Sequence, residues 1–234
     1  MSWKVFNLHL FQAESFHLWP AATALGGGAA LAGPGQRIDW SGGGWWMGRL
    51  DGMTLWEPRQ ILAWRALAMH ARNGGAVILP IIDWPQRPFA PGQTELPGVP
   101  HSDGSPFSDD SLYQTNALRF ELVNPVLEGD MSAVVRRVAG APLLGGEYFT
   151  GLHTGAGPRA YMIEDLEPED ANGVREILFG CPWREDSAAE AGLDFENPRL
   201  VVEIISAPEA NFPRMEPPFE ATVGFSFSES FDYL

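Results

Sequence analysis

Residues 118–123, Leu-Arg-Phe-Glu-Leu-Val, carry apolar side chains at every second position. Successive side chains of a β-strand point to opposite faces, so this spacing predicts a strand with one buried face. Similar runs follow at 134–138, 148–150, 159–163, 175–179, 200–205 and 221–227. Glycine-rich turns separate them, and Asn172-Gly173 between two such runs is typical of a β-hairpin. We therefore predict a small antiparallel β-barrel or sandwich over residues 112–234.

The first 84 residues predict a second β-rich unit. Residues 5–11 alternate and predict a strand, and the tryptophan-containing runs 37–40 and 45–50 flank Ser41-Gly-Gly-Gly44 as the arms of a hairpin would. Residues 76–82 predict a buried or edge strand, and Pro80 favours an edge because proline lacks the N–H that a central strand donates.

Residues 57–73 predict the one clear helix. Pro58 suits the first helical position, where its missing N–H is not needed, and Asn73-Gly74-Gly75 supplies an end. Apolar residues recur at steps of three and four and form one face, namely Ile61, Trp64, Leu67, Ala68 and Ala71. The expected fold class is thus mainly β (α+β), with this helix as part of the core of the N-terminal unit.

Residues 85–111 have a different composition. They contain many prolines and a polar Ser-Asp-Gly-Ser-Pro segment, and few large aliphatic residues. We expect no regular element there, and a loop of this length is either a linker between domains or an arm used for contact. The contact arm is the interpretation that we carry forward.

Charge and cysteine content exclude several function classes. The 234 residues include 30 acidic and 15 basic ones, for a net charge of −15, so binding to nucleic acid or to anionic membranes is not expected. Cys181 is the only cysteine, which rules out an internal disulfide and a thiolate-rich zinc site. The longest stretch of small apolar residues, 21–33, is too short to span a bilayer. We expect a protein made in the cytoplasm, without membrane insertion.

No catalytic motif stands out. The Gly26-Gly-Gly28 run does not open a phosphate-binding helix, the five histidines are not closely paired, and no serine-hydrolase or zinc-protease motif occurs. Cys181 beside Arg184 is a weak candidate for a reactive thiol. We predict no catalytic centre, cofactor or metal. Hydrolysis by paired carboxylates stays open, as does carbohydrate stacking on Trp45, Trp46 or Trp183.

The order of several motifs resembles tail-tip proteins of long-tailed, siphovirus-like bacteriophages. The segments Ser41-Gly-Gly-Gly-Trp-Trp46, Ile61-Leu-Ala-Trp-Arg-Ala-Leu67 and Gly74-Gly-Ala-Val-Ile-Leu-Pro80 are similar to the hairpin, helix and strand of their first half. Their second half is similar to Gly145-Gly-Glu-Tyr-Phe149, Arg159-Ala-Tyr-Met-Ile163, Ile177-Leu-Phe179, Pro182-Trp-Arg184 and Phe195-Glu-Asn-Pro198. This sequence differs from the family in having Cys181-Pro182 in place of two prolines, and a longer hairpin at Gly155-Ala-Gly-Pro158.

The resemblance, which covers residues from about 36 onward, implies a distal-tail or baseplate-hub protein. Such a protein has a β-sandwich-like, ring-forming N-terminal domain and a barrel-like C-terminal domain, assembles as a hexamer and has no catalytic centre. The implied partners are other copies of itself, the tail tube protein and the baseplate hub or tail-tip proteins, at the tail tip of the virion. We expect subunit contacts at Trp40, Trp45, Trp46, Pro88, Phe89, Pro97, Pro106 and Phe107. The alternative is a carbohydrate- or receptor-binding β module of a tail tip.

Overall fold

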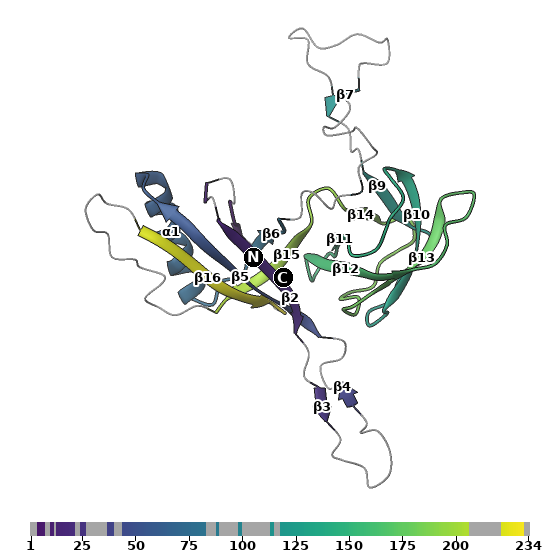
Figure 1. The fold of residues 1–234 in the computed structure, drawn as a ribbon, viewed down its shortest axis with the longest axis horizontal. Helices are drawn as coiled ribbons and strands as arrows, with labels where there is room; N and C mark the ends of the chain where they lie inside the picture. The colour runs from purple at the N-terminus through teal and green to yellow at the C-terminus, as the bar shows by residue number, and fades with distance from the viewer. Residues whose placement is uncertain are drawn as a thin grey trace.

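Two β-rich lobes, a mixed sheet with one helix and a closed barrel, make up the computed structural model (Figure 1). The structure describes residues 4–7, 10–11, 13–21, 24–26, 37–39, 44–82, 88, 98–99, 113–114, 118–205 and 221–231. Its β-rich class agrees with the expectation from sequence. The helix and the barrel lie at opposite ends of the longest axis of the molecule (Figure 1).

The first lobe is a six-stranded sheet with the order β1-β6-β15-β16-β5-β2. Its strands are β1 (Lys4–Val5), β2 (Ser15–Ala21), β5 (Trp45–Leu55), β6 (Val77–Pro80), β15 (Arg199–Ile204) and β16 (Ala221–Glu229). Only the pairing of β1 with β6 is parallel. Two short pairs are separate from this sheet, namely β3 (Ala24–Gly26) with β4 (Arg37–Asp39) and β7 (Gly98–Val99) with β8 (Tyr113–Gln114).

Helix α1 (Pro58–Arg72) confirms the predicted helix. The side chain of its N-cap residue Glu57 accepts the N3 backbone N–H while the Gln60 amide oxygen accepts the Glu57 N–H, a reciprocal capping box. Gly74, at φ 73°, follows the C-cap residue Asn73. The Trp64 ring packs on Phe225 of β16 at a centroid distance of 6.0 Å, so the helix covers one face of the sheet.

The second lobe is a closed barrel with the order β10-β13-β12-β11-β14-β9. Its strands are β9 (Arg119–Leu122), β10 (Ser132–Ala139), β11 (Tyr148–Leu152), β12 (Pro158–Leu166), β13 (Val174–Phe179) and β14 (Gly192–Asp194). Aromatic rings fill its interior, where Tyr161 stacks on Trp183 at 4.4 Å and Phe149 on Phe195 at 5.0 Å. The lobes thus have separate hydrophobic cores.

The strands are divided between the lobes differently from the expected C-terminal unit of residues 112–234. Strands β15 and β16 belong to the first sheet, where β16 lies between β15 and β5. The barrel is therefore inserted between β6 and β15 in the chain. Apolar side chains recur along β15 and β16 as they do along the barrel strands. The sequence pattern therefore predicts these two strands but does not indicate which strands they pair with.

Local expectations differ from the structure at four places. The strand expected at 5–11 is limited to Lys4–Val5, and Phe6, Leu10 and Phe11 lie outside any strand. The run at 37–39 pairs with 24–26 rather than with 45–50, because β5 has β2 and β16 as its two neighbours. Strand β6 lies between β1 and β15, so the buried alternative holds and not the edge position that Pro80 favoured; the pairing with β1 ends opposite Ile78, two residues before Pro80. Strand β7 lies within 85–111, where we expected no regular element; it is held by antiparallel pairing to β8.

Candidate functional site

The predicted contact residues that the structure describes are mostly enclosed. Trp46 is only 1% exposed, in the core of the first lobe. Trp45 on β5 is half-buried, and Pro88 is buried with its carbonyl accepting the Ala141 N–H at 2.8 Å. The other candidates lie outside the described residues: Trp40, Phe89, Pro97, Pro106 and Phe107. In the isolated chain, the Trp46 side chain is therefore not accessible to a neighbouring subunit or to a sugar.

Trp46 instead connects the two lobes. Its indole Nε1–H donates to the carbonyl of Ala160 on β12, at 2.7 Å, and its backbone N–H donates to the Glu229 carboxylate at 3.1 Å. Ala160 belongs to the barrel and Glu229 ends β16 of the sheet. One residue of the sheet is therefore hydrogen-bonded to both sides of the junction between the lobes.

A buried charge cluster lies at this junction. Glu229 is an acceptor for two guanidinium groups from the barrel: Arg184 donates from Nε and Nη2 at 3.0 and 2.9 Å, and Arg159 lies at 3.5 Å. Arg159 also donates to the Ser230 carbonyl, and Arg184 to the Gly44 carbonyl at 2.8 Å. We call Arg159, Arg184 and Glu229 the junction cluster.

Within the junction cluster, the Glu229 carboxylate compensates the charge of Arg184 although both groups are buried. Burial disfavours a charged guanidinium, but the Glu229 carboxylate outweighs this effect and holds the pKa of Arg184 above its ordinary value. The fork of Arg184 meets both carboxylate oxygens, the geometry in which a charge-assisted pair is strongest. Removing the Glu229 charge would leave two buried guanidinium groups uncompensated, so this carboxylate fixes how the two lobes meet.

A hydrogen-bonded chain continues from this cluster into the barrel. The Tyr161 hydroxyl accepts the Arg184 backbone N–H at 3.0 Å and lies 2.8 Å from His153 Nε2. Burial, with a contribution from Arg159 and Arg184 that Glu185 opposes, lowers the pKa of His153 to about 4. Burial also raises the pKa of Tyr161. Both side chains are therefore neutral at pH 7 and act as structural polar groups.

The geometry does not support the thiol candidate. Cys181 is buried, and burial raises the pKa of its thiol to about 11 despite the opposing effect of Arg184. A reactive cysteine needs an accessible thiolate. The Arg184 guanidinium that the sequence places near this thiol is held by Glu229 instead.

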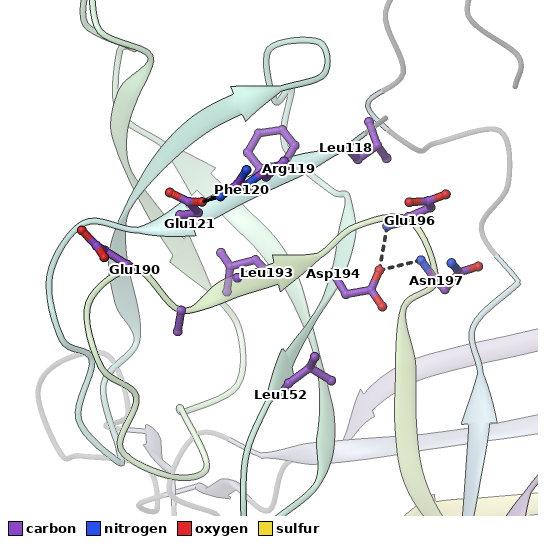
Figure 2. Close-up of a pocket in the computed structure, with 12 residues that line it drawn as sticks. Leu118, Arg119, Phe120, Glu121, Leu152, Glu190, Leu193, Asp194, Glu196 and Asn197 are labelled. Carbon is purple, nitrogen blue, oxygen red and sulfur yellow. Dashed lines mark hydrogen bonds and ion pairs between the residues drawn. The ribbon is translucent and has the colours of Figure 1, made fainter. Parts of the chain in front are cut away.

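A pocket of about 480 Å³ lies on the barrel surface over β9, β11 and β14 (Figure 2). Two of its carboxylates are already engaged. The Glu121 carboxylate pairs with the guanidinium groups of Arg119, at 2.6 Å, and Arg136, at 2.9 Å. Hydrogen bonds from Arg136, which has the larger effect, and from Arg119 hold the pKa of Glu121 below its ordinary value. Asp194 accepts the backbone N–H groups of Glu196 and Asn197, at 3.0 and 2.8 Å.

The remaining polar groups of the pocket lie at its two ends. Figure 2 shows Glu190 at one end and Asn197 at the other, with Leu193 and Leu152 between them. Glu190 has φ 65°, the only positive φ at a non-glycine residue in the described backbone. Amide and carboxylate groups around an apolar floor can hold a polar ligand such as a sugar. In the part of the chain that the structure describes, no cluster of histidine, cysteine and acidic residues could hold a metal ion.

Sequence reasoning missed both the junction cluster and the pocket. Glu229 is 45 residues from Arg184 and 70 from Arg159 in sequence. The one available signal was Glu229 at the end of the uncharged alternation of residues 221–228, and it does not indicate a partner.

Comparison of the sequence with protein-family models and with curated proteins finds no match. Among the residues that the structure describes, no helix is long and apolar enough to cross a membrane.

Proposed function

We propose that this chain is a structural protein of a long-tailed bacteriophage. In this proposal it assembles into a closed six-membered ring at the distal end of the tail and connects the tail tube to the baseplate hub or tail-tip proteins. The sheet with α1 supplies a ring-forming surface, and the barrel contacts both the next subunit and the neighbouring tail-tip components.

The junction cluster is the observation that carries this proposal. A ring closes only if every subunit holds its contact surfaces at the same fixed angle. Glu229, Arg159 and Arg184 join the lobes through buried charges, and the Trp46 indole adds a hydrogen bond across the same boundary. A hinged connection between domains would instead be polar and hydrated.

The chemistry of the buried polar groups supports a structural role over a catalytic one. The Cys181 thiol has a raised pKa, the His153 imidazole a lowered one, and the Glu229 carboxylate already has three donors. The net charge of −15 suits a channel through which DNA passes, because acidic surfaces repel the phosphate backbone.

The test is to locate the chain on phage particles. Antibodies raised against the purified protein should label the distal tip of intact tails in immunogold electron microscopy of the phage that encodes it. In parallel, negative-stain images of the purified protein should show rings with six-fold symmetry. Labelling of heads or of the whole tail shaft, or the absence of label from particles, would contradict the proposal.

A second function, carbohydrate binding by the barrel, is favoured by the pocket between Glu190 and Asn197. The full chain would be titrated with host-surface glycans, with Asn197→Ala as the pocket variant and Asn172→Ala, an exposed turn residue, as its control. Binding that the first substitution weakens and the second does not would support this function. Equal binding by both variants would rule the pocket out.

A further inference from the structure

The outer face of α1 is basic and apolar in a strongly acidic protein. Arg59, Arg65 and Arg72 point away from the sheet together with Leu62, which is 64% exposed, and Met69, which is 46% exposed. The helix contains no Asp or Glu. We call these five residues the helix face.

The arginines of the helix face form no ion pair with any residue that the structure describes. In the described part of the chain, every other arginine whose side chain is described lies in an ion pair with a carboxylate, namely Arg49, Arg119, Arg136, Arg137, Arg159, Arg175, Arg184 and Arg199. Acidic residues outnumber basic ones two to one in this chain, 30 against 15, so three adjacent unpaired cations are not explained by a shortage of carboxylates. Their charge is available to a partner.

The barrel carries a surface of the opposite charge. Glu164, Asp165 and Glu167 lie at the end of β12 and just beyond it, and Glu176 lies on the adjacent β13; all four are exposed. Leu178, which is 39% exposed, lies opposite Asp165 on the neighbouring strand. We call these five residues the barrel ridge.

Two residues of the barrel ridge with the same charge, Glu167 and Glu176, lie opposite one another. The Glu167 N–H donates to the Glu176 carbonyl at 3.0 Å, so these two residues lie directly opposite one another on neighbouring strands. Like charges in that position destabilise a sheet. Among the described residues, no ridge carboxylate is in an ion pair, and Arg137 and Arg175 of the barrel pair with Glu169 instead. A cationic partner from outside the chain would offset the repulsion.

The two surfaces cannot meet within one molecule. Helix α1 and strand β13 lie at opposite ends of the long axis (Figure 1), and the junction cluster fixes the lobes between them. We propose that the helix face docks on the barrel ridge of a second copy of this chain. This inference rests on the proposed ring and names the contact that builds it.

Such a contact is head-to-tail, because each copy uses a different surface toward each neighbour. Head-to-tail contacts close into rings when the rotation per subunit is fixed and otherwise form open filaments. The exposed leucine and methionine side chains of the helix face would be buried against Leu178. The ionic component predicts association that weakens as salt is added, because exposed charges are screened over about 10 Å at 0.1 M ionic strength.

A charge-swap experiment on the full chain tests the contact. The helix-reversed variant carries Arg59→Glu, Arg65→Glu and Arg72→Glu, and the ridge-reversed variant carries Glu164→Arg, Glu167→Arg and Glu176→Arg. A control variant carries Glu128→Arg, which reverses an exposed barrel carboxylate outside both the ridge and the pocket. Self-association is followed by sedimentation velocity at low and high salt, and circular dichroism checks that each variant is folded.

The wild type and the control should associate, more weakly at high salt. Each reversed variant alone brings like charges together and should associate at least about tenfold more weakly. An equimolar mixture of the two reversed variants should regain association, because every contact in an alternating assembly is then again between opposite charges. A loss of folding in either variant cannot produce this recovery.

Three results would overturn the proposal: a wild type that stays monomeric, a helix-reversed variant that associates as the wild type does, or a mixture that fails to recover. Electron microscopy of the same samples separates this contact from the proposed function. Rings formed by the helix-reversed variant would contradict the proposed contact but support the proposed ring. Charge-dependent filaments without rings would support the contact but contradict the ring.

Discussion

Glu229 and Arg184 form a two-pronged ion pair in which Nε and Nη2 of the guanidinium meet the two carboxylate oxygens at 3.0 and 2.9 Å. Glu229 ends the strand that crosses the middle of the sheet, and Arg184 follows the last residues of β13 in the barrel. The pair joins the two lobes at a point where both side chains are withdrawn from water. The orientation of the barrel on the sheet therefore depends on a single carboxylate and the groups that donate to it.

Replacing Glu229 with glutamine should destabilise the protein strongly. The substitution keeps the shape of the side chain but leaves Arg159 and Arg184 as buried cations without a counter-charge. Breaking a buried pair in this way costs about 3 to 5 kcal/mol in the free energy of unfolding, which urea denaturation would measure. Glu128→Gln, at an exposed carboxylate, is the control and should change stability by less than about 0.5 kcal/mol. Equal effects of the two substitutions would contradict the role of the junction cluster.

Gly48→Ala should destabilise the sheet, whereas Gly192→Ala should not. A Cβ at Gly48 would lie 2.5 Å from the His17 carbonyl oxygen and overlap the Phe227 ring, because β5 is packed closely against both neighbours. A Cβ at Gly192 would meet nothing within 4 Å. We expect a loss of about 1 to 3 kcal/mol for Gly48→Ala in thermal or urea unfolding, typical of overpacking. Similar stabilities of the two variants would show that the approach of these strands is looser than the structure indicates.

Stability should fall as the pH drops through the range set by His153. Its pKa is lowered from 6.5 to about 4 in the folded protein, so the unfolded chain binds the additional proton between these values. This stabilising contribution is complete above pH 6.5 and is lost progressively toward pH 4; its full size is about 3 kcal/mol.

The matched measurement is urea unfolding of the wild type and of His153→Gln at pH 7 and near pH 4.5. Carboxylates titrate equally in both proteins, so the difference between them isolates the histidine. The wild type should lose more stability than the variant on acidification. Parallel losses would show that the imidazole is accessible to protons in the native state.

The Cys181 thiol should be inert while the protein is folded. With a pKa of about 11, on the order of one molecule in a thousand carries a thiolate at pH 8, and the side chain is enclosed as well. A colorimetric aromatic disulfide should therefore react slowly with the native protein and rapidly after unfolding in urea. Because this is the only cysteine, the signal has a single source. Rapid reaction of the native protein would reopen the possibility of a catalytic thiol.

Local patterns predicted most of the secondary structure. The helix boundaries followed from Pro58 and from Asn73-Gly74, which act on the adjacent turns of backbone and so can be recognised within a few residues. Strands β9, β10, β11, β12, β13, β15 and β16 followed from alternation, although the three-residue β14 was too short to show it. The two-residue strand at Gly98–Val99 likewise depends on its pairing with β8 more than on its own sequence.

The amino-acid sequence by itself determined the β-rich class, the helix, the acidic charge and the single thiol, since each depends on composition or on neighbours along the chain. Only the tertiary structure decided which strands share a sheet, because alternation describes a strand's two faces and says nothing about its partners. It also decided that Trp46 is an internal connection and that Glu229 meets two arginines from the other lobe. Contacts between residues 45 to 114 positions apart come from the packing of whole elements, which no local pattern encodes.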